Sequence, residues 1–259
     1  MSRLRGEMEP LAQVSSLAPA VAVMAKVPGM AVVKTRLHES LGADRATALY
    51  RCFLLDRLDA LATLRDITGV VAFTPPEAEA LMRALAPPSL RLIPQRGADL
   101  GERLSNILID LLDLGHIAAL AVDSDSPTLP MAYVAEAAKL LSGATCDVVL
   151  GPCEDGGYYL VGLRCPQPAL FEGIPWSTDA VFAMTLDKAR AGGLSVHVLP
   201  QWFDVDTEAD LRRLHADMTA GTHGPPRTYA FVRQLYQPLG AAPSPSLTRG
   251  MAAGKDRCP

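Results

Sequence analysis

Short uninterrupted apolar runs alternate along this chain with longer stretches in which apolar residues recur every three or four positions. Short runs bounded by turn-forming residues predict strands buried on both faces, whereas the wider spacing predicts helices. Strands are expected at residues 20–25, 69–73, 91–94, 117–122, 147–151, 158–162 and 195–199. Helices are expected at residues 42–64, 103–114, 130–141, 178–190 and from 207 onward, with a further helix start at 74–77.

This alternation predicts a three-layer α/β fold with a mostly parallel central sheet covered by helices on both faces. The strands on either side of residues 152–157 are an exception, because so short a connection cannot hold a helical crossover. One of these two strands is therefore expected to run antiparallel, as a hairpin arm. Thr74, Thr178 and Thr207 are each expected to cap a helix, and Asp210 is expected to complete a capping box with Thr207.

The pattern also divides the chain into three parts. Residues 1–18 mix charged and turn-forming residues and are expected to form a flexible leader. Residues 19–219 carry the alternating strands and helices and are expected to form one domain. Pro, Gly, Ser and Ala dominate from residue 220, so 220–259 is expected to be a partly disordered tail with a short helix near 228–237.

Composition narrows the function classes. The chain has 259 residues, of which 49% are hydrophobic, 20% charged and 5% aromatic, with a net charge of −4. The acidic balance and the few aromatic residues argue against a nucleic-acid partner. No apolar stretch is long enough for a signal peptide or a membrane span, so none is expected.

The cysteines and histidines argue against a disulfide framework and a zinc site. The five cysteines are odd in number and show no CxxC spacing, and the histidines are scattered. Free thiols are typical of a cytoplasmic protein, which is the expected location. The cysteines are Cys52, Cys146, Cys153, Cys165 and Cys258. Cys153 has no His nearby in the sequence to activate it, so we interpret it as structural.

Two aspartates directly follow the buried run at 117–122. Asp123 and Asp125 are two positions apart, and Pro127 ends the strand pairing. Carboxyl ends of strands in open α/β sheets bind ligands, and hard carboxylate oxygens suit Mg²⁺ or Mn²⁺. The alternative is a polar strand-to-helix loop with turn-forming residues.

A basic loop follows the first expected strand. It holds Lys26, Lys34 and Arg36, and Gly29 permits close approach of the backbone to a ligand. Neither a GxGxxG nor a P-loop sequence is present. We interpret this loop as a phosphate-binding loop; the alternative is a solvated basic loop.

Two later clusters add candidate residues. Asp204 and Asp206 form a second acidic pair, from which a further metal ligand is expected, although Asp206 could equally interact with the helix dipole. In residues 154–158, Asp155 could act as a base or orient an acceptor, or could simply belong to an Asp-Gly turn. Residues 176–178 are expected to wall an acceptor pocket, with a core position as the alternative for Trp176.

Five motifs in this order resemble the DUF2064 family over roughly residues 20–215. The resemblance is carried by Val27-Pro-Gly29 with Val33-Lys34-Thr35-Arg36-Leu37, by Gln95-x-Gly97-x-Asp99-Leu-Gly101-Glu-Arg103, by Asp123-Ser-Asp125-Ser-Pro127, by Gly151-Pro-x-x-Asp155-Gly-Gly-Tyr158 and by Asp204-Val-Asp206-Thr207. Members of this family are labelled arsenosugar-biosynthesis or radical-SAM-associated glycosyltransferases. The resemblance implies a GT-A-like fold of nucleotide-diphospho-sugar transferases, related also to phospholactate guanylyltransferases and molybdenum-cofactor nucleotidyltransferases.

The resemblance also implies roles for individual residues. Asp125 matches the metal-binding aspartate of the fold, with Asp123 beside it, and Asp206 matches a late second ligand. Lys34 and Arg36 would act with Asp125 and Asp155 in catalysis. Donor-binding residues would be Lys26, Gly29, Lys34, Thr35, Arg36, Gln95, Gly97, Asp99, Gly101 and Arg103. Acceptor-binding residues would be Asp155, Gly156, Gly157, Tyr158, Trp176, Ser177 and Thr178.

The sequence therefore predicts a transferase dependent on Mg²⁺ or Mn²⁺ that uses a nucleotide or nucleotide-sugar donor and a small-molecule acceptor. Glycosyl transfer is the leading expectation. The basic loop keeps nucleotidyl transfer with release of pyrophosphate as the alternative. A non-catalytic nucleotide-binding module is the third possibility. The sequence does not indicate an oligomeric state.

Overall fold

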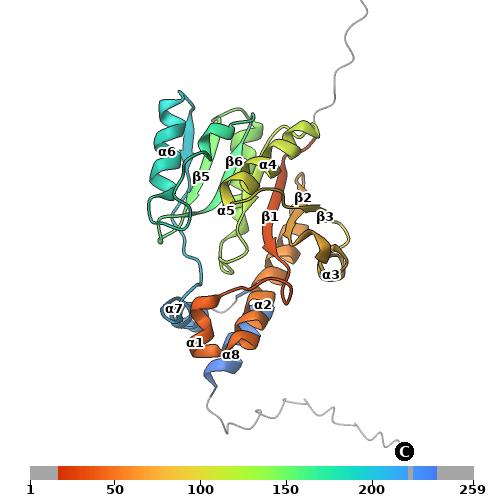
Figure 1. Ribbon diagram of the computed structural model, residues 1–259, viewed down its shortest axis with the longest axis vertical. Coiled ribbons are helices and arrows are strands. Elements are labelled where there is room, and N and C mark those ends of the chain that lie inside the picture. Colours follow the sequence, from red (N-terminus) through yellow and green to blue (C-terminus); the bar gives the residue numbers. More distant parts are fainter. Residues whose placement is uncertain (1–16, 221–223, 238–259) are drawn as a thin grey trace, which may run out of the picture.

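The computed structural model describes residues 17–220 and 224–237, and within them seven strands form one sheet (Figure 1). The strand order is β3-β2-β1-β4-β6-β5-β7. The strands are β1 (Ala20–Lys26), β2 (Thr68–Thr74), β3 (Arg91–Pro94), β4 (Ala119–Val122), β5 (Val148–Pro152), β6 (Tyr158–Leu163) and β7 (Val196–Val198). Each lies where the apolar runs predict it.

The central strands are apolar on both faces because helices cover both sides of the sheet. All four residues of β4 are buried, and β1 is buried up to its last residues. β1 pairs in parallel with β2 and β4, whereas β6 is antiparallel to both β4 and β5. The expectation of one antiparallel strand beside residues 152–157 is confirmed, and the strand is β6.

Helices pack on the two faces of the sheet through the apolar side of their amphipathic surfaces. One face is covered by α2 (Ala43–Ala62), α3 (Glu79–Leu85) and α5 (Met131–Ser142), and the other by α4 (Leu100–Asp113) and α6 (Val181–Ala191). In α4, for example, Leu104, Ile107, Leu108 and Leu111 recur at helical spacing and face the sheet. The three-layer α/β architecture expected from the sequence is therefore present.

A third apolar cluster lies below the carboxyl ends of the central strands. There the first half of α2 packs with α1 (His38–Leu41), α7 (Glu208–Ala220) and α8 (Pro226–Tyr236) around Phe53, Val205 and Val232 (Figure 1). The short helix expected near residues 228–237 is α8, and it packs along α2. This part of the expected tail is therefore joined to the domain, while residues 1–16 of the expected leader and 238–259 lie outside the described residues.

Two expected helix caps are corrected by the structure. Thr74 does not cap a helix, because it remains in the sheet as the last residue of β2, opposite Lys26. A 3₁₀ turn at Pro76–Ala78 precedes α3, which begins only at Glu79. α6 begins at Val181, so Thr178 lies in the loop before it.

The expected cap at Thr207 is confirmed. The Thr207 hydroxyl accepts a hydrogen bond from the backbone N–H of Asp210, and the Asp210 carboxylate accepts one from the N–H of Thr207, at 3.3 and 2.7 Å. These reciprocal bonds fix where α7 starts and so where the preceding aspartates lie. None of the helices in the described ranges is both long and apolar enough to cross a membrane.

Candidate active site

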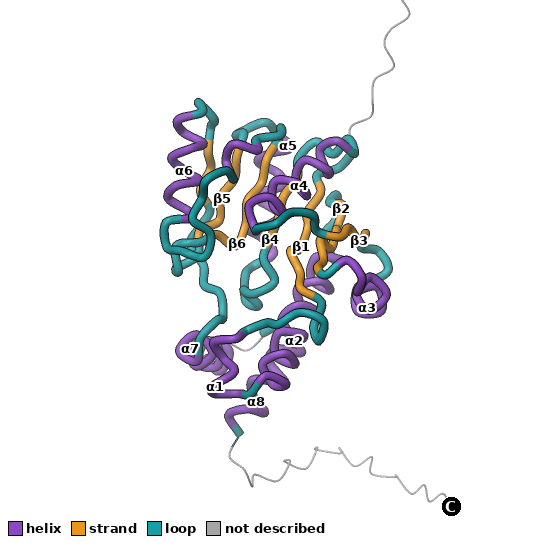
Figure 2. The backbone as a smooth tube through the Cα atoms, in the orientation of Figure 1, coloured by secondary structure: helices purple, strands orange, loops and turns teal. Residues whose placement is uncertain are grey.

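A cavity of about 770 Å³ opens at the carboxyl ends of β1 and β4. Loops gather at this edge, between the sheet and the lower helices (Figure 2). This is the edge at which open α/β sheets bind ligands. The predicted site residues that line it are Lys26, Lys34, Thr35, Arg36, Gln95, Arg103, Asp123, Asp125, Asp155, Gly157, Tyr158, Trp176, Ser177, Thr178 and Asp206. Segments from the whole length of the domain therefore meet in one cavity.

The centre of this cavity is a lysine held between two aspartates. The Lys34 ammonium lies 2.6 Å from a carboxylate oxygen of Asp125 and 2.6 Å from one of Asp206. The Lys34 side chain is 2% exposed, whereas those of Asp125 and Asp206 are 40% and 41% exposed. Burial disfavours the ammonium, but the two carboxylates outweigh it and raise the pKa of Lys34 above its ordinary value.

Backbone contacts explain why these three residues meet. The N–H of Val205 donates to the carbonyl of Asp125 at 3.0 Å, which joins the segment before α7 to the loop after β4. Lys34 has a left-handed backbone with φ of 51°, which ends the loop after β1 and starts the turn at Thr35–Leu37. The aspartates can therefore face the lysine from two different segments.

Asp123 has a different environment from Asp125. One of its oxygens accepts a hydrogen bond from the Ser126 hydroxyl at 2.5 Å, and the other is buried without a hydrogen-bond partner among the described residues. Burial raises the pKa of Asp123 to about 7, although the buried Arg57 guanidinium opposes this effect. Arg57 itself donates to the carbonyls of Ser126 and Leu129. These bonds hold the loop after β4, which carries Asp123 and Asp125 and is called the aspartate loop below.

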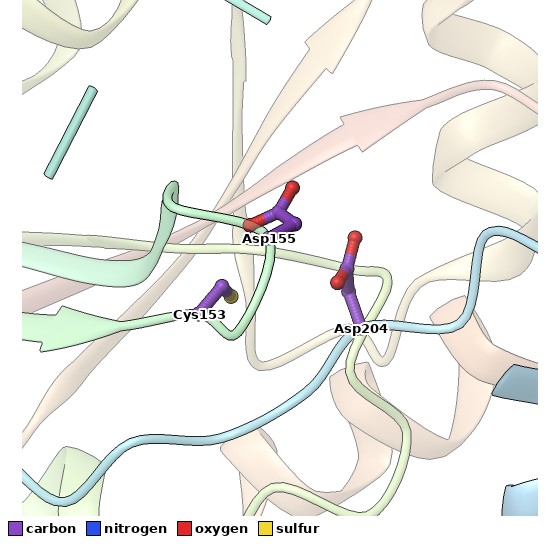
Figure 3. A group of neighbouring side chains, drawn as sticks. All are labelled: Cys153, Asp155 and Asp204. Atoms are coloured by element: carbon purple, nitrogen blue, oxygen red, sulfur yellow. The ribbon is translucent and has the colours of Figure 1, made fainter. Parts of the chain in front are cut away.

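A second acidic pair lies in the same cavity. Donor atoms of Asp155, Asp204 and Cys153 all lie within 4.8 Å of one another (Figure 3). Asp155 comes from the loop after β5, Cys153 from the end of that strand, and Asp204 from the segment after β7 (Figure 3). Burial and repulsion from Asp155 and Asp206 raise the pKa of Asp204 to about 6.

The thiol of Cys153 is buried among these carboxylates. Burial raises its pKa most, followed by the negative charges of Asp123, Asp204 and Asp155. This electrostatic environment makes a reactive thiolate unfavourable and is consistent with the interpretation that Cys153 is not a nucleophile.

Cations line another part of the cavity wall. Lys26, Arg36 and Arg103 all line it, and within the described part of the chain none of them forms a salt bridge. Arg103 also donates to the carbonyl of Gly97 at 3.1 Å. Gln95 donates to the carbonyls of Ala25 and Ala72, so it ties β1 to β2 beside these cations. Three cations with no carboxylate partner form a suitable surface for phosphate groups.

An aromatic pair walls the far side of the cavity. Tyr158 and Trp176 meet edge to face, with ring centroids 6.4 Å apart. Trp176 also lies directly against Gly101, where an added Cβ would come within 2.5 Å of its indole nitrogen. The closeness of helix α4 to the Trp176 loop therefore depends on the glycine at this position.

Comparisons with known proteins agree with this fold and these motifs. Residues 57–178 match the model of a family described as an uncharacterized protein conserved in bacteria, DUF2064. A crystal structure from Desulfovibrio desulfuricans G20, described as that of a candidate nucleotide-diphospho-sugar transferase, is 35% identical. The match covers 83% of this chain and 94% of that protein, with a TM-score of 0.76. The chain belongs to the DUF2064 family.

A more distant match shows the fold alone. Molybdopterin-guanine dinucleotide biosynthesis protein A from Archaeoglobus fulgidus is 13% identical, with a TM-score of 0.50. That match covers 78% of this chain and all of the other. None of the curated proteins matches the sequence. The nucleotide-diphospho-sugar transferase fold predicted for this DUF2064 protein is confirmed.

Five predicted site residues do not line the cavity of this DUF2064 protein and instead shape its loops. They are Gly29, Gly97, Asp99, Gly101 and Gly156. Asp99 caps α4 by accepting from the N–H of Glu102 at 2.8 Å. Gly156 has a φ of 88°, and a Cβ there would lie 2.2 Å from the carbonyl oxygen of Asp179.

Asp204 belongs to the acidic pair from which one further metal ligand was expected, and it lies beside Asp155 rather than beside Lys34. Two other residues of the site were not among those predicted. Tyr50 and Arg57 come from α2. The only sign of them in the amino-acid sequence was the helical spacing that is typical of core residues. The Tyr50 hydroxyl lies 3.0 Å from the Ser124 hydroxyl, which donates to the carbonyl of Met24. These contacts fix the aspartate loop against β1.

Proposed function

We propose that this protein is a metal-dependent transferase that takes a group from a nucleotide-activated donor, with glycosyl transfer to a small-molecule acceptor as the leading reaction. The observation that carries the proposal is the composition of the cavity. Six aspartates line the same space at the carboxyl edge of the sheet as three cations that have no carboxylate partner within the described residues. The 35% identical relative described as a candidate nucleotide-diphospho-sugar transferase supports the choice of donor.

The Asp125 and Asp206 pair fits a Mg²⁺ or Mn²⁺ ion. Both carboxylates already contact one positive group, the ammonium of Lys34. The space between them therefore stabilises a positive charge. Both are partly exposed toward the cavity, and carboxylate oxygens are the donors that these ions prefer. Asp123 would support the pair from the same loop. When bound, the ion would offset negative charge on the donor phosphates.

The chain's own cations would bind those phosphates. Lys26, Arg36 and Arg103 line the cavity without carboxylate partners, so their charge is free to pair with phosphate oxygens. Lys34 and Arg36 would stabilise the charge that develops on the departing phosphate group, which is the main requirement of such a reaction.

The acceptor would lie on the side of Asp155. Tyr158, Trp176 and the loop at 177–178 line this side and would exclude water from the reacting groups. Asp155 would orient an acceptor hydroxyl or take its proton. Its carboxylate is held by the N–H of Gly157, which donates to it at 2.9 Å.

The location of the reaction would be the cytoplasm, since the four cysteines in the described ranges are free thiols.

Nucleotidyl transfer is the second candidate, and the number of cations favours it. In addition to Lys34, three cations of the cavity have no carboxylate partner within the described residues. Their positive charge is larger than the two phosphates of a sugar nucleotide would need. A triphosphate donor would make use of this additional charge. The two reactions differ in their products, because glycosyl transfer releases a nucleoside diphosphate and nucleotidyl transfer releases pyrophosphate.

A two-step experiment tests the proposal. A thermal-shift screen of nucleoside triphosphates and sugar nucleotides, with and without Mg²⁺ or Mn²⁺, first identifies the donor, because a ligand of the native state raises its apparent stability. Incubating the full chain with that donor and a panel of hydroxylated and phosphorylated acceptors then shows which product forms. Binding without any turnover would favour a non-catalytic module. No metal-dependent stabilisation by any nucleotide would refute the proposal.

A further inference from the structure

Asp155 and Asp204 differ from the neighbouring acidic pair in their salt bridges. Within the described ranges, no Lys, Arg or His side chain forms a salt bridge with either residue, whereas Lys34 bridges the neighbouring Asp125 and Asp206. The donor atoms of Asp155 and Asp204 nevertheless lie within 4.8 Å of each other, and the sulfur of Cys153 lies equally close (Figure 3). Two like charges at this distance repel each other unless a cation joins them.

The backbone fixes this group rather than leaving it on a free loop. The N–H of Trp202 donates to the carbonyl of Pro152, and the N–H of Glu154 donates to the carbonyl of Trp202, each at 3.0 Å. These bonds align the segment that carries Asp204 with the end of β5 that carries Cys153. The three donor side chains are therefore held together by the fold itself.

A second observation points to a ligand at the same place. The Oδ1 atom of Asp123 is buried and has no hydrogen-bond partner among the described residues, and Asp123 lines the same cavity as Cys153. Of the charged groups around Cys153, Asp123 has the largest effect on the thiol. A buried carboxylate oxygen without a partner is unfavourable unless a cation or a donor satisfies it.

We propose that Cys153, Asp155 and Asp204 form a binding site for a thiophilic divalent cation such as Zn²⁺, separate from the Asp125 and Asp206 pair. One sulfur and two carboxylate oxygens form a donor set that suits Zn²⁺ better than Mg²⁺, which prefers oxygen donors alone. Three protein ligands would leave one position of a tetrahedral ion open, and all three side chains belong to the cavity lining. The site goes beyond the proposed function, because binding of this ion does not require transfer to occur.

Cobalt provides a direct test, since Co²⁺ occupies such sites and a thiolate bound to it gives a charge-transfer absorption in the near ultraviolet. The full chain is freed of metal and titrated with Co²⁺, and Zn²⁺ is then added as competitor. We expect the absorption to appear and to disappear on addition of Zn²⁺. Cys153→Ser should abolish it, whereas Cys146→Ser, which changes another buried cysteine of the same chain, should retain it.

A second variant covers the case in which Cys153→Ser does not fold. Asp204→Asn keeps the thiol but removes a carboxylate, so the absorption should persist while Co²⁺ binds at least about tenfold more weakly. The absence of any thiolate absorption in the wild-type protein, or its persistence in Cys153→Ser, would overturn the inference. Unchanged Co²⁺ affinity in Asp204→Asn would do the same.

The outcome is distinguishable from failure of the proposed function. Asp125→Asn removes the expected ion of the transfer reaction but leaves Cys153, Asp155 and Asp204 in place, so it should keep the cobalt absorption. If the wild-type protein shows the absorption but no nucleotide binds to it, the cation site stands and the transferase proposal fails.

Discussion

The cavity holds two pairs of aspartates that carry the same charge in different surroundings. Asp125 and Asp206 share the ammonium of Lys34, and both form a salt bridge with it at 2.6 Å. Asp155 and Asp204 lie beside the thiol of Cys153 and form no salt bridge within the described residues. Burial and repulsion from Asp155 and Asp206 raise the pKa of Asp204 to about 6. The first pair therefore has an internal cation, whereas we propose that the second pair receives a cation from solution.

This difference suggests a division of roles. The first pair is preorganised around a positive group and is suited to receive an ion that arrives with the donor phosphates. The second pair is a candidate for a cation bound independently of the donor. Substitutions of Asp125, Lys34 and Asp204 distinguish these two roles.

The largest effect is expected for Asp125→Asn. It keeps the shape of the side chain but removes the charge that Lys34 and the expected ion share. We expect the rate of group transfer to fall by at least about 100-fold, as for loss of one charge-stabilising group in other enzymes. Product release from the donor identified by thermal shift measures the rate. Asp113→Asn, on the exposed end of α4, is the matched control and should retain activity. Near-normal transfer in Asp125→Asn would exclude a role for the first pair.

Lys34→Met tests the internal cation directly. The substitution leaves the carboxylates of Asp125 and Asp206 close together without their bridge. We expect a loss of about 2–4 kcal/mol in the free energy of unfolding, less than for a fully buried pair because water screens the partly exposed carboxylates. Urea denaturation measures this loss. Millimolar Mg²⁺ should raise the Tm of Lys34→Met more than that of the wild type, because the ion can replace the ammonium.

The control for this variant is Lys26→Met. Lys26 lines the same cavity but forms no salt bridge within the described part of the chain, so its loss should leave stability nearly unchanged. If Mg²⁺ stabilises Lys34→Met and the wild type equally, the carboxylate pair does not receive the ion.

Asp204→Asn should show the smallest effect, and one that depends on pH. The pKa of Asp204 is raised from 3.8 to about 6, so the folded protein binds a proton that the unfolded chain has already lost over this range. That stabilising contribution is complete below about pH 4 and is lost as the pH rises through 6. The wild type should therefore lose stability relative to Asp204→Asn between pH 4 and 6, by on the order of 1–2 kcal/mol after allowance for solvent screening.

Urea denaturation at several pH values in the presence of EDTA measures this difference. EDTA matters because a cation bound at Cys153, Asp155 and Asp204 would oppose the burial and repulsion that raise the pKa of Asp204. A difference between the two proteins that does not change with pH would show that Asp204 ionises normally.

Much of the fold follows from local patterns. The apolar run at residues 117–122 forms β4 because both faces of this strand are covered by helices, which leaves no polar position. The reciprocal bonds of Thr207 and Asp210 form because they need only four consecutive residues. Thr74 failed as a cap because its pairing with β1 competes with the local helix signal. Sheet pairing is a contact distant in sequence, so the local pattern could not reveal it.

The α/β architecture, the antiparallel strand and the acidic pairs near strand ends all follow from the amino-acid sequence. How those charges are paired depends on contacts that form only in the folded protein. Lys34 and Asp206 are 172 positions apart, yet their side chains meet at 2.6 Å. The structure also separated Asp123, whose Oδ1 is buried and whose charge is opposed by Arg57, from Asp125, which forms a salt bridge with Lys34. A spacing of two residues fixes which carboxylates are near one another along the chain, but the charge that neutralises each one comes from segments that only folding brings together.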